Sequence, residues 1–259
     1  MNLPLSPKLS HSIDAKKDQS RTQISVIIPV HNQEKNISLS LTRLKQVLNS
    51  TLLAFEFVII DDGSEDNSLR VLRKEQKTDP RVKVISYGPN KGKGYAIKTG
   101  VMHSSGDIII FVDGDLDISP QVIKDYVKEL EIFDLVIASK RHPLSKVKAP
   151  WSRKILSRMF NVLVRVSLDI KIKDTQAGLK AGNGEKLRKI FKVILVKRYA
   201  FDVELLAIAT DLKLNIKEMP VEINLGARFH IYEIFQMFLD LAAISYRYRI
   251  KRWYQRQLV

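Results

Sequence analysis

Short apolar runs alternate with segments of helical periodicity through the first half of the chain. The runs are rich in β-branched residues, as buried strands are, and they cover residues 24–30, 57–60, 82–85, 107–112 and 135–138. The intervening segments repeat apolar residues every three or four positions, as Leu41, Leu44 and Leu48 do, which predicts helices. Successive strand–helix units favour an α/β fold with a mostly parallel sheet covered by helices on both faces.

The second half of the chain has a more helical pattern. Residues 151–168 repeat apolar side chains at helical spacing (Ile155, Met159, Val162 and Val166), and residues 201–209 also predict a helix. Residues 169–184 are rich in turn-forming types and predict a loop. Pro220 interrupts the apolar stretch 216–223, so this stretch is expected to be an edge strand.

Composition narrows the class of protein. The chain has 259 residues, of which 45% are hydrophobic, enough for one substantial core. It has no cysteine, which excludes disulfides and thiolate metal sites. Its net charge of +15 favours anionic partners such as nucleotides, phosphates, nucleic acid or a membrane surface, although a merely basic, solvated surface explains the charge equally well.

No segment has the sequence of a signal peptide or of a membrane span. Residues 1–23 contain prolines, serines and mixed charges without an apolar stretch, and are expected to be a disordered leader. The most apolar long stretch, 231–248, is interrupted by Glu233, Asp240 and Arg247, so no transmembrane helix is expected.

Three carboxylates follow the strand at 107–112 within five residues. Asp113, Asp115 and Asp117 would lie at the carboxyl edge of the sheet, where open α/β sheets bind ligands. Their mutual repulsion is relieved by a cation, and hard oxygen ligands suit Mg²⁺ or Mn²⁺ that bridge to substrate phosphates.

Polar loops after other strands are expected at the same edge. Asp61 and Asp62 can accept hydrogen bonds from a base or a ribose, or alternatively form a turn and cap a helix. The segment 90–94, with Lys91, Gly92 and Lys93, resembles a phosphate cradle but is equally explained as a surface turn.

Two later segments add candidate polar groups. Lys140 and Arg141 follow the strand at 135–138 and can hold a phosphate, or belong to a solvated charged loop. Asp174 and Gln176 can present a carboxylate and an amide to a substrate, or lie in an ordinary interhelical loop. The five scattered histidines indicate neither a zinc site nor a catalytic triad.

The C-terminal residues 229–259 combine an apolar helical face with basic and aromatic residues. Ile234, Phe235, Phe238 and Leu241 share the apolar face, and five Arg or Lys residues lie between 247 and 256. This composition suits a bilayer headgroup region or a nucleic-acid backbone. A core helix followed by a solvated basic tail explains it as well.

The motifs, taken in order, resemble those of family 2 glycosyltransferases, and more narrowly the dolichyl-phosphate or polyprenyl-phosphate branch. The matching segments are 25–32, 58–64, 90–100, 106–117, 139–142 and 174–180, within a resemblance that covers residues 23–250. The resemblance implies a GT-A fold over 24–228 and an amphipathic interfacial helix over 229–259. It also implies inverting transfer of a hexose from a nucleotide sugar to a lipid phosphate, with Mg²⁺ or Mn²⁺, at the cytoplasmic face of the membrane.

The resemblance also implies roles for individual residues. The nucleotide-sugar contacts would be Pro29, His31, Asp61, Asp62, Lys93, Asp113 and Gln176. The metal ligands would be Asp113, Asp115 and Asp117, and the catalytic residues Asp115, Asp174 and Arg141. The acceptor phosphate would contact Lys140, Arg141 and Arg228.

The sequence departs from the family pattern at a few positions. His31 and Gln33 replace the usual Tyr and Glu, and Ala227 replaces a Ser before Arg228. The multi-span membrane domain of some relatives is not expected. UDP-glucose is expected as the donor ahead of GDP-mannose. Two alternatives stay open: transfer to a polysaccharide or protein acceptor, and a non-enzymatic module that binds nucleic acid. The acidic clusters count against the second, because they repel phosphate backbones.

Overall fold

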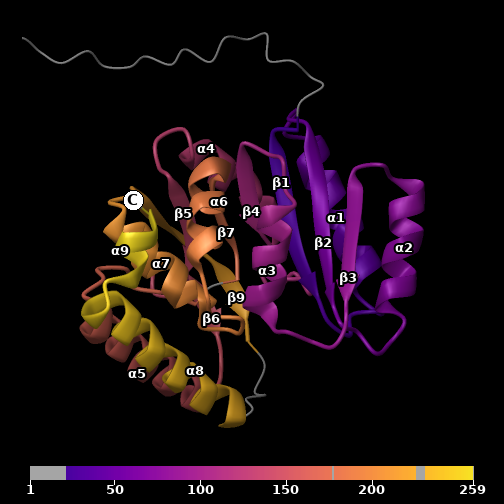
Figure 1. Ribbon diagram of the computed structural model, residues 1–259. Helices are drawn as coiled ribbons and strands as arrows, with labels where there is room; N and C mark the ends of the chain where they lie inside the picture. Colours follow the sequence, from indigo (N-terminus) through magenta and orange to yellow (C-terminus); the bar gives the residue numbers. More distant parts are fainter. Residues whose placement is uncertain (1–21, 177, 226–230, 259) are drawn as a thin grey trace, which may run out of the picture.

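A seven-stranded sheet forms the centre of the computed structural model, which describes residues 22–176, 178–225 and 231–258 (Figure 1). Of the leader expected over residues 1–23, residues 1–21 lie outside the described part of the chain. The strand order is β3-β2-β1-β4-β7-β5-β8. These strands are β1 (Ile24–Val30), β2 (Phe55–Asp62), β3 (Val82–Tyr87), β4 (Ile108–Phe111), β5 (Leu135–Ser139), β7 (Lys180–Asn183) and β8 (Ile216–Pro220).

The expected, mostly parallel sheet is confirmed, with one exception. Strand β7 runs antiparallel to both of its neighbours, β4 and β5. The sequence prediction of a loop over these residues is wrong, because Lys-Ala-Gly-Asn has low intrinsic strand propensity. Small side chains are what this position requires, since a Cβ on Gly182 would lie 2.9 Å from the Leu187 side chain.

Helices cover both faces of the sheet, as the strand–helix alternation predicts. One face packs against α1 (Ile37–Asn49), α2 (Ser68–Thr78), the short 3₁₀ turn Pro120–Val122 and α4 (Ile123–Glu129). The other face packs against α3 (Lys93–Met102), α6 (Gly184–Val193) and α7 (Phe201–Asp211). Alternate residues of each strand enter the two cores, as Ile27 and Ile28 do.

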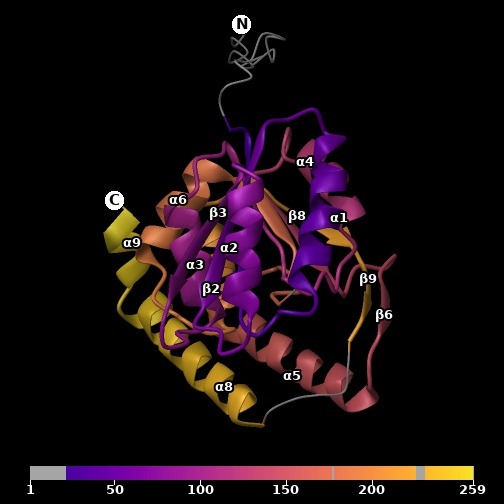
Figure 2. The ribbon, with the colours of Figure 1, turned by 90° about the vertical axis from the view of Figure 1, so that its right-hand side faces the viewer.

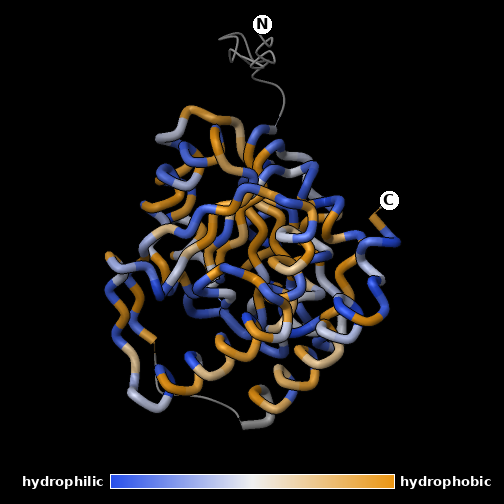
Figure 3. The backbone as a smooth tube through the Cα atoms, turned by 90° about the vertical axis from the view of Figure 1, so that its left-hand side faces the viewer, coloured by the Kyte–Doolittle hydropathy of each residue, from blue (hydrophilic) through white to orange (hydrophobic). Residues whose placement is uncertain are grey.

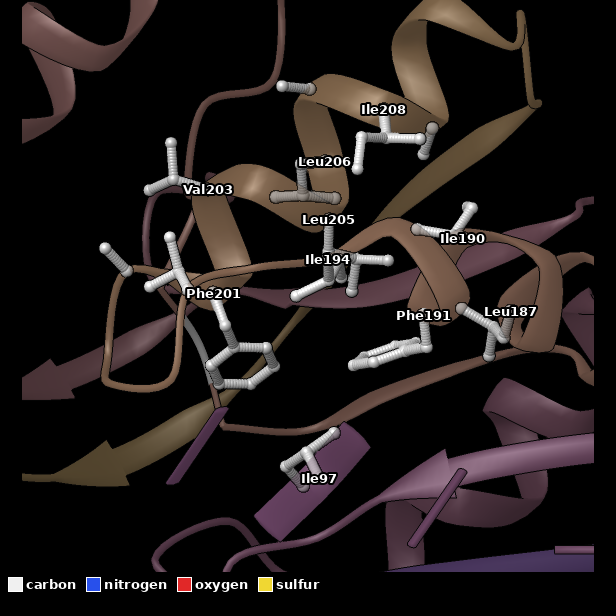
Figure 4. Close-up of a cluster of buried hydrophobic side chains, with 14 of the residues drawn as sticks. Ile97, Leu187, Ile190, Phe191, Ile194, Phe201, Val203, Leu205, Leu206 and Ile208 are labelled. Carbon is white, nitrogen blue, oxygen red and sulfur yellow. The ribbon is translucent and has the colours of Figure 1, made fainter. Parts of the chain in front are cut away.

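The core on the second face is the larger one and includes the later helices. Figure 4 shows Phe191 of α6 and Phe201 of α7 between the strands and Ile97 of α3. The carboxylate of Glu204 is buried in this apolar surrounding. It accepts hydrogen bonds from the amides of Leu195 (3.1 Å) and Val196 (2.7 Å) and from Tyr254.

Two long helices lie side by side at one end of the sheet, α5 (Trp151–Leu168) and α8 (Ile231–Ser245) (Figures 1 and 2). They contact each other through the rings of Phe160 and Phe238, whose centroids are 5.5 Å apart. Next to them, β6 (Lys146–Lys148) and β9 (Glu222–Asn224) form a separate parallel pair. The stretch 216–223 is thus an edge strand, as expected, but it divides after Pro220 between two sheets.

After α8 the chain turns back onto the body of the protein. A π-helical turn, Tyr246–Ile250, leads to α9 (Trp253–Leu258), which packs against α6. Tyr254 is fully buried, and Arg247 lies 3.3 Å from the Glu204 carboxylate. The alternative of a core helix followed by a solvated basic tail therefore applies only in part, because Arg247 and Tyr254 contact the core. Over the described ranges no helix is long and apolar enough to cross a bilayer.

Candidate functional site

The carboxyl ends of β1, β2 and β4 meet at one edge of the sheet and border a cavity of about 640 Å³, here called the first cavity. Parallel strands bring their carboxyl ends together, so loops far apart in sequence share this cavity. Residues from the three predicted loops that line it include Pro29, His31, Asp62, Asp113 and Asp115.

Asp62 holds the glycine-containing loop in place. Its two carboxylate oxygens accept hydrogen bonds from the backbone amides of Lys91 (2.8 Å) and Gly92 (2.9 Å). Gly92 has a φ of +99°, and a Cβ there would lie 2.6 Å from the Lys197 carbonyl oxygen. The loop is therefore a shaped wall of the first cavity, and its shape depends on Asp62.

Asp61, which the resemblance also assigned to the nucleotide, does not line either cavity. It accepts hydrogen bonds from the Ser86 hydroxyl (2.8 Å) and the Ser64 amide (3.3 Å). In this structure it organises the turn beneath the cavity, which matches the turn alternative.

Lys93 and Asp113 form an ion pair of 2.5 Å at the boundary of the first cavity. Burial alone would lower the pKa of Lys93, but the charges of Asp113 and Asp202 outweigh this and raise it, so the lysine is cationic. Asp202 is in turn paired at 2.8 Å with Lys180, whose side chain is only 2% exposed. Positive and negative side chains therefore alternate from strand β7 to the acidic loop, in the order Lys180, Asp202, Lys93 and Asp113.

Asp115 and Asp117 complete an acidic loop beside Asp113. Leu116 has a positive φ of 53°, which bends the loop between the two carboxylates. Partial removal from water raises the pKa of Asp115, and the charge of Asp113 raises it further. The pKa of Asp117 rises for the same reasons, with Asp115 as its main charged neighbour.

These side chains fit a divalent cation that also binds a substrate phosphate. Burial raises the pKa values of Asp115 and Asp117, and the neighbouring carboxylates raise them further, so a cation would stabilise the ionised forms of both groups. Within the described residues no three Asp, Glu, His or Cys side chains are gathered as a complete metal site. One or two carboxylates completed by phosphate oxygens are, however, how proteins commonly hold Mg²⁺.

A second cavity, of about 770 Å³, adjoins the first. The two share Lys93, Asp113, Tyr199 and Met237 in their walls. The second cavity combines basic groups with an apolar lining. The basic groups are Lys140, Arg141, Arg153, Lys154 and Arg158, and the apolar residues include Leu116, Val147, Phe160, Ile223, Ile234 and Phe238.

Arg141 presents an incompletely bonded guanidinium at the second cavity. One terminal nitrogen donates to the Ser157 carbonyl oxygen (2.7 Å), while the buried Nε has no partner among the described residues. Burial lowers the pKa of Arg141, partly offset by Asp174. A guanidinium remains cationic at neutral pH, so it is suited to bind an anion there.

Asp174 holds Lys140, which lines the second cavity, in position. It is buried and accepts a 2.7 Å hydrogen bond from the Lys140 amide, and its Oδ2 lies 3.3 Å from Lys140 Nζ. Gln176, two residues on, lines the second cavity and accepts from Lys140 through its carbonyl oxygen. Asp174 lines neither cavity, and Arg228 lies outside the described residues.

Three residues that contribute to the site were not predicted from the sequence: Lys180, Asp202 and Arg153. Asp202 and Arg153 line the second cavity, and Lys180 supports Asp202 from the antiparallel strand β7. One signal was available, because a helix that is otherwise apolar on all sides carries Asp202 and Glu204 in its first turn. Buried charges of this kind require partners.

A nucleotide-sized cavity at the carboxyl edge of a parallel sheet, with an acidic loop and a basic second cavity, defines a nucleotide-dependent group-transfer enzyme of the α/β class. The family model described as "Glycosyl transferase family 2" matches residues 25–191. The chain belongs to this family, which confirms the resemblance and sets the nucleic-acid-binding alternative aside.

Curated relatives match over nearly the full chain. A dolichyl-phosphate beta-glucosyltransferase of Trichomonas vaginalis is 30% identical, covering 91% of this chain and 77% of its own. The dolichyl-phosphate beta-glucosyltransferase of Homo sapiens is 29% identical, covering 91% and 79%.

Solved structures confirm the GT-A fold. Glucosyl-3-phosphoglycerate synthase from Mycobacterium tuberculosis, solved with Mn²⁺, UDP-glucose and phosphoglyceric acid, superimposes with a TM-score of 0.64. Its sequence is 20% identical, and the match covers 88% of this chain and 80% of that one.

Proposed function

We propose that the protein transfers glucose from UDP-glucose to a dolichyl or polyprenyl phosphate. The observation that carries this proposal is the junction of two unlike cavities at Lys93 and Asp113. The first cavity suits a nucleoside diphosphate, while the second combines a basic group for phosphate with an apolar lining for an isoprenoid chain. The names of the curated relatives support the glucosyl donor and the dolichyl phosphate acceptor.

The reaction requires alignment and charge stabilisation more than a base. A phosphate monoester with a second pKa of about 6 is already anionic at neutral pH. Its oxygen forms a bond to the anomeric carbon from the side opposite the diphosphate, whose bond to that carbon breaks with both electrons leaving on UDP. Arg141 and Lys140 orient the attacking phosphate, and Lys93 stabilises negative charge that develops on the leaving group.

A divalent cation completes the site in this proposal. Asp113 and Asp115 would hold it together with the diphosphate, and Asp117 would act from the same loop. The cation supplies charge neutralisation on the departing diphosphate. The Mn²⁺ complexes of the mycobacterial synthase support a divalent ion, and either Mg²⁺ or Mn²⁺ suits oxygen ligands.

The remaining site residues keep the roles that the resemblance implies, as proposals. Pro29, His31 and Asp62 border the nucleotide, and Gln176 contacts the sugar. Asp174 acts through Lys140, because it is buried beneath that residue and lines neither cavity. In this proposal the protein works peripherally at the cytoplasmic face of a membrane, with residues 24–228 as the catalytic domain. Within 229–259, helix α8 would lie at the membrane surface, while the residues after it fold back onto α6.

The test is transfer of radiolabelled sugar from UDP-glucose or GDP-mannose, in separate reactions, to a short polyprenyl phosphate with Mg²⁺ or Mn²⁺. We expect label in the lipid extract from UDP-glucose, abolished by EDTA and by Asp115→Ala. Label from GDP-mannose alone would overturn the choice of donor. A folded protein that labels only a glycan or a protein would overturn the lipid acceptor.

A further inference from the structure

Helix α8 and the segment before α7 form a wall of the first cavity to which the proposed reaction assigns no residue. The side chains of this wall are Arg198, Tyr199, Gln236, Met237 and Asp240. Tyr199 and Met237 also line the second cavity, so the wall reaches the junction of the two cavities. In the proposed reaction the anomeric carbon passes from a diphosphate in the first cavity to a phosphate in the second. The hexose must therefore lie beside this junction during transfer.

Two polar side chains interrupt the apolar pattern of α8 at this wall. Figure 3 shows mainly apolar positions along the two helices at the lower end of the molecule, of which α8 is one. Gln236 and Asp240 are four residues apart, so they share one face of the helix. Both line the first cavity and neither lines the second. The pair is therefore placed to meet the polar donor and not the apolar chain of the acceptor.

The carboxylate of Asp240 has unused capacity to accept hydrogen bonds. Its Oδ2 is buried and has no hydrogen-bond partner among the residues that the structure describes. Burial raises the pKa of Asp240 more than the charges of Arg198 and Arg247 lower it. Arg247 is itself engaged elsewhere, at 3.3 Å from the Glu204 carboxylate. A buried acceptor without a donor is unfavourable, and a hydroxyl group of a bound ligand would satisfy it.

Arg198 holds the amide of Gln236 in a defined orientation. Its Nη1 donates a hydrogen bond to Gln236 Oε1, which leaves Nε2 as the donor group of that amide. Arg198 is in turn packed against the glycine-containing loop: a Cβ on Gly94 would lie 2.8 Å from its carbonyl oxygen, and a Cβ on Gly92 would lie 3.3 Å from its Cγ. The wall therefore offers an amide donor and a carboxylate acceptor on one helix face. Neighbouring hydroxyl groups of a hexose can both donate and accept, so they match this pair.

The negative charge of Asp240 indicates which part of the donor it contacts. A carboxylate repels a diphosphate, whereas the uncharged hexose presents hydroxyl groups that donate to carboxylates. We propose that Gln236 and Asp240 form the subsite for the transferred hexose, with Asp240 accepting from one hydroxyl group and Gln236 donating to another. This inference rests on the proposed function, because it takes the donor to be a nucleotide sugar. Asp240 then contributes to the choice of sugar, since a site built to bond a hydroxyl group rejects a ligand that lacks it.

The test compares the binding of UDP and of UDP-glucose to the full chain by titration calorimetry, with Mn²⁺ and without acceptor. Asp240→Asn should raise the Kd for UDP-glucose about tenfold and leave the Kd for UDP unchanged, because UDP lacks the hexose. Gln236→Leu should act in the same direction. Asp125→Asn is the matched control, since Asp125 is exposed on α4 and lines neither cavity, and both Kd values should stay at wild type. Retained UDP binding shows at the same time that each variant is folded.

The outcomes separate the subsite from the proposed function. An unchanged Kd for UDP-glucose in Asp240→Asn, or equal losses for UDP and UDP-glucose, would overturn the subsite, while lipid glucosylation by the wild type would leave the proposed function standing. A loss confined to UDP-glucose in a protein that does not glucosylate polyprenyl phosphate would refute the proposed acceptor and leave the subsite standing. If the wild type binds GDP-mannose instead, a loss confined to GDP-mannose against GDP supports the subsite and refutes the donor. A wild type that binds neither nucleotide sugar would refute both.

Discussion

Substituting Gly178 by alanine should disable the site without unfolding the protein. A Cβ at this position would lie 2.1 Å from Oδ2 and 3.0 Å from Cγ of Asp113, whereas ordinary contact begins at 3.4 Å. The carboxylate must therefore move by more than about 1 Å, which disrupts its 2.5 Å ion pair with Lys93. A displacement of about 1 Å at a reacting centre costs roughly a hundredfold in rate, or about 3 kcal/mol in activation free energy.

The stability of Gly178→Ala should change little. The Asp113 side chain is 30% exposed, so losing its ion pair costs at most about 1 kcal/mol of unfolding free energy. The assay is kcat at saturating donor and acceptor, beside the midpoint of thermal unfolding. Gly88→Ala is the matched control, because nothing lies within 4 Å of a Cβ there, and it should behave as wild type in both measurements.

Two results would refute this reasoning. A kcat near the wild-type value would mean that the position of the Asp113 carboxylate does not matter. A loss of activity accompanied by a large drop in the unfolding midpoint would mean that Gly178 is needed for the fold. The predicted effect is steric, because the added Cβ would overlap the Asp113 carboxylate.

Three further predictions concern the charges that support the fold. Lys180→Met removes the ion-pair partner of the buried Asp202 carboxylate and should lower the free energy of unfolding in urea by about 3 kcal/mol. The double variant with Asp202→Leu should recover most of that stability, and a double variant without recovery would contradict the pairing. Glu204→Ala should speed hydrogen exchange of the backbone amides that its carboxylate holds, whereas unchanged exchange would show that those amides are protected otherwise. Hydrogen bonds from Arg81 keep the pKa of Asp79 below its usual range despite burial. The ionised Asp79 carboxylate therefore stabilises the folded state above about pH 4, and this stabilisation is lost as the pH falls further. Asp79→Asn should therefore be less stable than wild type at pH 7 by about 1 kcal/mol and should lose less on acidification, as measured by urea unfolding at several pH values.

The sequence predicted those parts of the fold in which local preference and burial agree. The β-branched runs of β1, β2 and β5 are buried on both faces, so periodicity and propensity indicate the same structure. Strand β7 could not be predicted in this way. Its four residues have little strand propensity, yet they pair with β4 and β5, and a Cβ on Gly182 would lie 2.9 Å from the Leu187 side chain of α6.

The site was predictable where it consists of loops directly after strands. Asp62, Asp113 and Lys93 meet because the carboxyl ends of parallel strands share an edge. The role of each carboxylate was not predictable, because adjacent residues in one loop accept hydrogen bonds from different partners. Asp62 holds the loop at 91–92, while Asp61 binds Ser86 below it. The ion pair of Lys180 and Asp202 was not predictable, because it forms only when β7 takes its place in the sheet as an antiparallel strand.

A helical hydrophobic pattern does not reveal which side of a helix faces the core. In α5 the most regular apolar stripe, from Ile155 to Val166, is exposed, and a second set of residues containing Phe160 and Val164 packs inward. The periodicity therefore predicted the helix correctly but not which of its sides is buried.

The net charge of +15 does not show which basic side chains are available to a partner, because that depends on where each one lies in the fold. Lys180 and Arg247 neutralise buried carboxylates and offer nothing to a partner. Lys140 and Arg141 line the second cavity, where the acceptor phosphate would bind in the proposed reaction. Arg153, Lys154 and Arg158 of α5 line the same cavity. Neutralising Arg141, which lines the second cavity and not the first, should therefore impair transfer even to a short acceptor in detergent while leaving donor binding intact.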